Sequence, residues 1–303
     1  MVSRYWAHSA LAMDPRLNAR WIATMAYVGR IISLPAPALS TFRQPVPSSV
    51  DPSNVPFRAQ PPALATMIES ILPSPLTRTH VMRGLQHTDG LVQHVTAITL
   101  ARGLQKLAVV QDLFKQIEAD IGEEPSTSQE NPWARRRREL EMEARKRVPE
   151  LGVIIAFAQK AATMAPAEPE TDVEVALASK SAMLTEVALR LFGLCNKTMP
   201  TMASEVRFDV GRLLVSASSA SAERRARREA REGSVVSDSG SVASVGTVGT
   251  AGMGGGFGQA RGNVEGFEAL SQLHVLQLLS EVKDWSWMNK AGMYSPTVKR
   301  SKH

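Results

Sequence analysis

Two clusters of basic residues are the side chains of this chain best suited to chemistry, and that chemistry is the binding of phosphate. The first cluster consists of Arg135, Arg136, Arg137, Arg138, Arg145, Lys146 and Arg147, with three glutamates interspersed. The second lies at 224–231, inside the run 223–232 in which five arginines alternate with acids and alanine. Three interpretations stay open for both: a solvated helix face held by i,i+4 ion pairs, contacts to phosphates, and a localisation signal.

Neither cluster contains interleaved aromatic residues, so stacking on nucleic-acid bases is not indicated. Any RNA contact made by these side chains would therefore be to the backbone and to shape rather than to sequence. For the first cluster we take RNA phosphate contact as the prediction for its seven basic residues, with the other two interpretations left open.

The remaining reactive residue types do not form a catalytic pattern. Cys195 is the single cysteine and sits among apolar residues, which predicts a core position. His80, His87 and His94 recur every seven residues, but a turn separates the third from the others and no acid or cysteine completes a metal site. The glycine-rich stretch 252–258 matches no phosphate-binding motif. We therefore predict no enzyme activity, no cofactor, no metal and no small-molecule substrate.

The elements that must position these residues are helices. Residues 85–107 read as the end of one helix at His87, a tight Thr88–Gly90 turn, and a longer helix from Leu91 with apolar residues at helical spacing. Two amphipathic helices joined by a short turn form the unit from which helical solenoids are built. Further helices are predicted at 15–32 (opened by Asp14 and Pro15), 62–72, 76–87, 91–120, 132–147, 151–164, 172–196, 202–216 and 264–283.

Composition changes divide the predicted helices into segments. Residues 1–216 form the helical-repeat region, interrupted by disordered loops at 36–60 (proline-rich) and 122–131 (polar). Residues 217–263 are rich first in arginine and then in Ser and Gly, which predicts a disordered insertion. Residues 264–290 continue the solenoid and lead into a tail. The predicted fold is all-α, an armadillo/HEAT-like helical solenoid with disordered loop insertions.

The composition of the whole chain indicates a helical protein without a membrane span and with an acidic partner. The 303 residues contain 44% hydrophobic and only 5% aromatic residues, a balance that favours helix-on-helix packing. No apolar run reaches the length that spans a membrane, and one cysteine fits a reducing compartment. The formal net charge of +6 indicates an acidic partner, of which nucleic acid is the commonest.

Several blocks of sequence carry a family resemblance. They are Tyr5-Trp6, residues 18–25 (Asn-Ala-Arg-Trp-Ile-Ala-Thr-Met), 29–35 (Gly-Arg-Ile-Ile-Ser-Leu-Pro), 71–77 (Ile-Leu-Pro-Ser-Pro-Leu-Thr) and 84–87 (Gly-Leu-Gln-His). Together they resemble the N-terminal region of the nucleolar pre-ribosomal-associated protein 1 family. The resemblance covers about 5–120 well, and 170–215 and 265–290 loosely.

This resemblance implies a non-catalytic, armadillo-like scaffold in nucleolar biogenesis of the large (60S) ribosomal subunit, supporting rRNA processing. It implies partners among pre-60S assembly factors, including an RNA helicase, and closeness to pre-rRNA. Family proteins are far longer, so we expect this chain to be a fragment whose cut repeat array exposes apolar surface. The alternative interpretation is a generic armadillo-type protein–protein adaptor unrelated to ribosomes, in which the arginines serve import or solubility.

Overall fold

The protein is all-α in the part that its computed structural model describes, which comprises residues 6, 11–45, 55–122, 131–164, 171–204 and 256–281. These residues form one isolated antiparallel bridge, Arg43 to Phe57, and no strand. The elements are α2 (Ala19–Ile32), η1 (Leu39–Phe42), α3 (Leu64–Ile71), α4 (Arg78–Leu85), α5 (Gly90–Ile121), α6 (Pro132–Arg147), α7 (Leu151–Thr163), α8 (Asp172–Thr198), α9 (Pro200–Ser204) and α11 (Gly256–Glu281).

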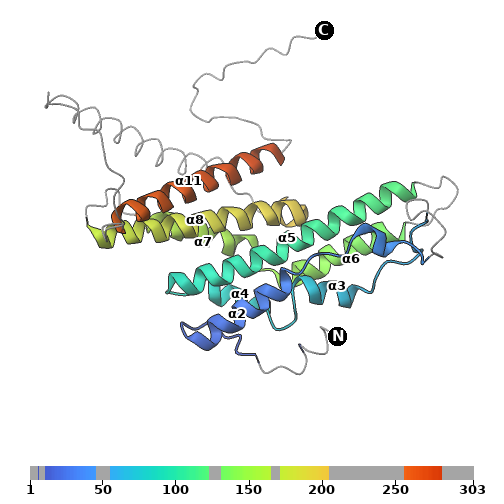
Figure 1. Ribbon diagram of the computed structural model, residues 1–303, viewed down its shortest axis with the longest axis horizontal. Helices are drawn as coiled ribbons and strands as arrows, with labels where there is room; N and C mark the ends of the chain where they lie inside the picture. The colour runs from blue at the N-terminus through green and yellow to red at the C-terminus, as the bar shows by residue number, and fades with distance from the viewer. Residues whose placement is uncertain are drawn as a thin grey trace, which may run out of the picture.

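The long helix α5 is the centre of the fold (Figure 1). Helices α2, α3, α4 and α6 pack on it from one side and α8 packs on it from the other, while α7 and α11 pack on α8. The buried side of α5 repeats at three and four residues, and Leu100, Leu104, Leu107 and Phe114 on it are fully buried. This spacing is the apolar stripe of a helix that several partners cover.

The predicted hairpin around 88–90 is confirmed, with ends within two residues of those expected. Asp89 caps α5: its Oδ1 accepts hydrogen bonds from the backbone N–H groups of Leu91 (2.8 Å) and Val92 (3.4 Å). Satisfying these N–H groups fixes where the second helix starts. The two helices then approach closely at Gly84, where an added Cβ would lie 2.9 Å from Cβ of Thr96 on α5.

The helices predicted at 62–72, 132–147, 151–164 and 172–196 are also present, as α3, α6, α7 and α8. The first predicted helix begins later than expected, at Ala19 instead of residue 15, and its cap is Asn18 rather than Asp14. Asn18 Oδ1 accepts a hydrogen bond from the Trp21 N–H at 2.7 Å. The indole N–H of Trp21 reaches back to the Met13 carbonyl at 3.3 Å, which holds 13–18 outside the helix.

The disorder predicted for 36–60 is wrong for its described ends, 36–45 and 55–60. Phe42 of η1 is buried in edge-to-face contact with Phe114 of α5 and Trp133 of α6, at centroid distances of 6.2 and 5.6 Å. The Trp133 indole N–H donates to the Arg58 carbonyl at 3.1 Å. Burying a ring against two others offsets the entropy of ordering this proline-rich chain.

The last helix also differs from the prediction, since α11 begins at Gly256 inside the segment 217–263 that was expected to be disordered. The sequence from 256 to 281 contains no proline to interrupt a helix. Of the helix predicted at 202–216, only the start lies among the described residues, within α9. Residues 123–130, 217–255 with the arginine run 224–231, and the tail 282–290 lie outside them.

Within the described residues, no helix combines the length and the apolar character that crossing a membrane requires.

Candidate nucleic-acid interface

Three of the seven predicted phosphate-binding residues hold α6 to its neighbours. Arg137 forms a two-pronged ion pair with Glu118 of α5, at 2.8 and 3.1 Å. Arg147 donates to the Glu69 carboxylate at 2.8 Å and to the Leu72 carbonyl, both at the end of α3. Arg136 donates to the Pro62 carbonyl at 2.9 Å. Charge-assisted bonds of this geometry fix position, so these arginines act within the fold.

The hydrogen bond to Glu118 raises the pKa of Arg137 above its ordinary value, and this outweighs the opposing effect of burial. The guanidinium is therefore a permanent cation that is already matched by a carboxylate. A phosphate could reach Arg137 only by displacing Glu118 from a half-buried site.

The other four basic residues lie toward solvent. Arg135, Arg138 and Lys146 are exposed along one side of α6, with Met142 between them and Arg145 half-buried beside them. Arg135 pairs with Glu139 at 3.0 Å and Lys146 with Glu143 at 2.9 Å, although both basic side chains are more than 70% exposed. Exposed ion pairs of this kind contribute at most about 1 kcal/mol, so phosphate can compete for them. The structure thus divides the predicted seven-residue cluster into an inward and an outward group.

A second basic surface, on α2, was not predicted from the sequence. Arg20, Tyr27 and Arg30 are exposed on α2, a helix without any acidic residue. Arg102 of α5 is also exposed and lies against α2 at Gly29, where an added Cβ would lie 2.5 Å from its Nη1. The signal that could have revealed this surface is the scarcity of acidic residues between 15 and 111.

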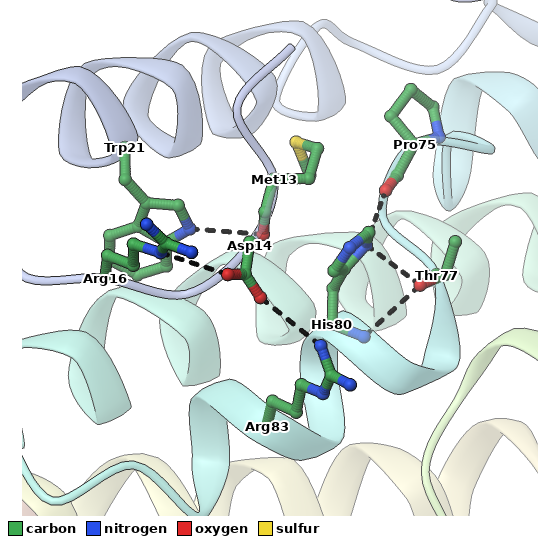
Figure 2. Close-up of polar contacts among 8 residues, drawn as sticks. All are labelled: Met13, Asp14, Arg16, Trp21, Pro75, Thr77, His80 and Arg83. Carbon is green, nitrogen blue, oxygen red and sulfur yellow. Dashed lines mark hydrogen bonds and ion pairs between the residues drawn. The ribbon is translucent and has the colours of Figure 1, made fainter.

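Figure 2 shows how the segment before α2 is attached to α4. Asp14 lies between Arg16 (3.1 Å) and Arg83 of α4 (3.4 Å), in two exposed ion pairs. Nearby, the His80 ring contacts Thr77 Oγ1 at 2.9 Å and the Pro75 carbonyl at 3.2 Å. His80 therefore orders the start of α4, which is a structural role.

A buried polar cluster joins α5, α8 and α11. Glu186 of α8 is 2% exposed and accepts hydrogen bonds from Arg190 (3.0 Å) and from His274 of α11 (2.9 Å). Burial acts to raise the pKa of Glu186, but the hydrogen bonds and charges of His274 and Arg190 outweigh it and lower the pKa overall. The carboxylate therefore stays ionised and ties α11 to α8.

His94 of α5 belongs to the same cluster. Its Nδ1 is buried and has no hydrogen-bond partner. Burial lowers the pKa of His94, the Glu186 charge opposes that shift, and Arg190 adds to it. The ring is therefore kept neutral between two charged side chains.

Cys195 is fully buried on α8, as predicted, and burial raises the pKa of its thiol to about 12. A thiol with that pKa does not supply the thiolate that nucleophilic chemistry needs. Among the described residues, no group of three or more His, Cys, Asp or Glu side chains is placed to hold a metal ion.

Comparison with known proteins gives one match of note. Over 103 residues the chain is 27% identical to Nucleolar pre-ribosomal-associated protein 1 of Saccharomyces cerevisiae. The match covers 34% of this chain and 5% of the yeast protein, so the chain spans a small part of that relative's length. No protein-family model and no solved structure matches the chain.

Proposed function

We propose that this protein is a non-catalytic scaffold in nucleolar biogenesis of the large ribosomal subunit. The observation that carries the proposal is the similarity to the yeast protein, whose name describes it as nucleolar and associated with pre-ribosomes. The all-α structure agrees with a scaffold built from packed helices. The net charge of +6 agrees with a partner rich in phosphate.

In this proposal the helices belong to an armadillo/HEAT-like solenoid. Its partners are pre-60S assembly factors, including an RNA helicase, and pre-rRNA contacted through the backbone. On α6 the contacts to RNA come from the outward residues Arg135, Arg138 and Lys146, because the inward ones are matched by Glu118 and Glu69.

The test is sucrose-gradient sedimentation of the tagged protein from cells, with fractions probed for large-subunit pre-rRNA. We expect the protein to co-migrate with pre-60S particles, and to shift to the top of the gradient after RNase treatment. A tagged chain that stays at the top without RNase, while a known large-subunit assembly factor migrates in the particle fractions, would contradict the proposal.

The second candidate is a protein–protein adaptor unrelated to ribosomes. It is favoured by Leu270, Leu273 and Leu276 of α11, which are 41, 47 and 61% exposed. Leucines exposed along one helix are typical of surfaces that bind other proteins. Retention of partners after RNase treatment, without pre-rRNA in any fraction, would favour the adaptor.

A further inference from the structure

The positive charge of this protein is concentrated in one part of the chain. Residues 15–111 contain nine Lys or Arg and three Asp or Glu, so this third of the chain accounts for the entire formal net charge of +6. Of the three acids, Glu69 is paired with Arg147 and Asp89 caps α5, while Asp51 lies outside the described residues. Of the two acids in the described part, Glu69 is therefore already bound to α6 and Asp89 to the first N–H groups of α5.

Helix α2 presents part of this charge to solvent. Its inward face is formed by Trp21, Met25, Val28 and Ile32, which are all nearly or fully buried. Its outward face carries Arg20, Tyr27 and Arg30, with the tyrosine 44% exposed. Neither arginine forms an ion pair with any carboxylate in the described part of the chain, in contrast to the arginines of α6.

Arg102 of α5 also has no carboxylate partner among the described residues, but it lies on another side of α2. Its guanidinium lies against Gly29 on the buried side of the helix, and Gly29 is nine residues, or about half a turn around the helix, from Arg20. Two guanidinium groups without described carboxylate partners and one exposed aromatic ring therefore share the outward face of α2.

The length of the surface indicates a polymer rather than a small anion. Arg20 and Arg30 are ten residues apart, which is about 15 Å along a helix. One phosphate cannot bridge that distance, whereas a nucleic-acid strand presents phosphates repeatedly along it. Proteins that bind single strands combine a basic surface with aromatic side chains on which bases stack, and Tyr27 lies between the two arginines.

We propose that Arg20, Tyr27 and Arg30 of α2 form a binding surface for single-stranded RNA. The two arginines contact separate, non-adjacent phosphates of one strand, and Tyr27 stacks on a base. This inference deepens the proposed function by naming an RNA-contacting surface, but it is tested on the purified chain. Its failure is therefore distinct from failure to enter pre-ribosomal particles.

The test is fluorescence anisotropy of the 303-residue chain with a labelled 20-nucleotide oligouridylate, measured over a series of salt concentrations. Reversing both α2 arginines (R20E with R30E) should weaken binding by at least about tenfold at moderate salt, because two phosphate contacts become repulsive. The slope of log affinity against log salt should fall by about 1.4, since each contact to a single strand contributes about 0.7. R30E alone should reduce both quantities by about half as much on a logarithmic scale.

Substitutions of Tyr27 test base stacking separately from the effect of charge. Tyr27→Ala should weaken binding by about 5- to 100-fold without changing the salt slope, and Tyr27→Phe should retain affinity. The matched control is K115E with K160E, an equal change of charge at exposed positions of α5 and α7 outside both proposed RNA-contacting surfaces, and it should cost less than R20E with R30E. Circular dichroism melting confirms that each variant is folded, since all the substituted side chains are exposed.

Equal losses from R20E with R30E and from K115E with K160E, with no effect of Tyr27→Ala, would overturn the proposal and leave a general electrostatic attraction. Unchanged affinity of R20E with R30E would overturn it as well. Displacement of the RNA by polyglutamate of equal charge concentration would show that an acidic protein segment is the ligand instead of RNA.

Discussion

We expect one residue, His94, to make the stability of the fold sensitive to acid, because its buried Nδ1 has no hydrogen-bond partner. Because its pKa is lowered by burial, the unfolded chain binds a proton more readily than the folded chain does. The stability that depends on neutral His94 is therefore complete above its ordinary pKa of 6.5 and declines as pH falls through the lowered value. Glu186 acts in the same direction, but only below its own ordinary pKa of 4.5.

His94→Leu should flatten this dependence. The variant removes both the group that must stay neutral and its unsatisfied nitrogen, so the free energy of unfolding should change less between pH 7.5 and 5.5 than in the original chain. Urea unfolding at a series of pH values measures it. His87→Leu is the control outside the cluster, since His87 Nδ1 accepts a hydrogen bond from Asp89 N–H. An identical pH profile for His94→Leu and the original chain would contradict the assignment.

The sequence could not predict which residues of the basic cluster on α6 are available to a ligand. The alternation of Arg and Glu correctly indicated i,i+4 pairs such as Arg135–Glu139. The partners of Arg137 and Arg147 are Glu118 and Glu69, which lie 19 and 78 positions away. Contacts between residues so far apart in the sequence depend on how α6 packs on α5 and α3, and the local spacing of residues does not predict them.

At the scale of elements, the helices were predictable where capping and periodicity agree. Asp89 before α5 and Asn131 with Pro132 before α6 are start signals beside clear apolar or charged patterns. Asp14-Pro15 is an equally good local signal, but Trp21 binds the Met13 carbonyl and moves the start to Ala19. The order around Phe42 was missed because Phe114 and Trp133, which cover it, are distant in sequence.

Two helix contacts made through glycine should respond oppositely to alanine. At Gly84, an added Cβ meets the buried Thr96, whose Oγ1 donates to the Val92 carbonyl and has no room to move. Gly84→Ala should therefore lower the free energy of unfolding by about 1–2 kcal/mol, as overpacking does. At Gly29 the added Cβ meets only the end of the flexible Arg102 side chain, so Gly29→Ala should gain roughly 0.5 kcal/mol from helix propensity.

Urea unfolding of the two variants beside the original chain measures this difference. A destabilised Gly29→Ala variant would mean that Arg102 is fixed in position rather than movable. A neutral Gly84→Ala variant would mean that α4 and α5 are less closely packed than the structure indicates.

For the molecule as a whole, the sequence predicted the all-α class because aromatic content is low and apolar residues recur at helical spacing. How the helices pack could not be predicted in the same way. The placement of α8 on α5, and of α11 on α8, depends on buried side chains from several helices, including the Glu186–His274 contact across 88 residues. The solenoid arrangement and the loops outside the described residues stay predictions.

The exposed leucines of α11 form an apolar surface that is in contact with water. One side of this helix is buried against α8 through Ser271, Val275 and Leu278. Leu270, Leu273 and Leu276 lie on the other side, which faces away from α8. Apolar side chains exposed along a helix associate with other apolar surfaces, including another copy of the same chain. We therefore expect the isolated chain to self-associate as its concentration rises.

L273E combined with L276E should abolish that association without lowering the melting temperature, because both side chains are about half exposed or more and contribute little to the core. Sedimentation velocity over a range of concentrations measures it. Val275→Glu is the matched control, since Val275 is buried against α8 and its replacement should release α11 and increase aggregation. Self-association that persists in the double variant would assign it to another surface, and the basic face of α2 would then be examined next, since association through that face would weaken with salt.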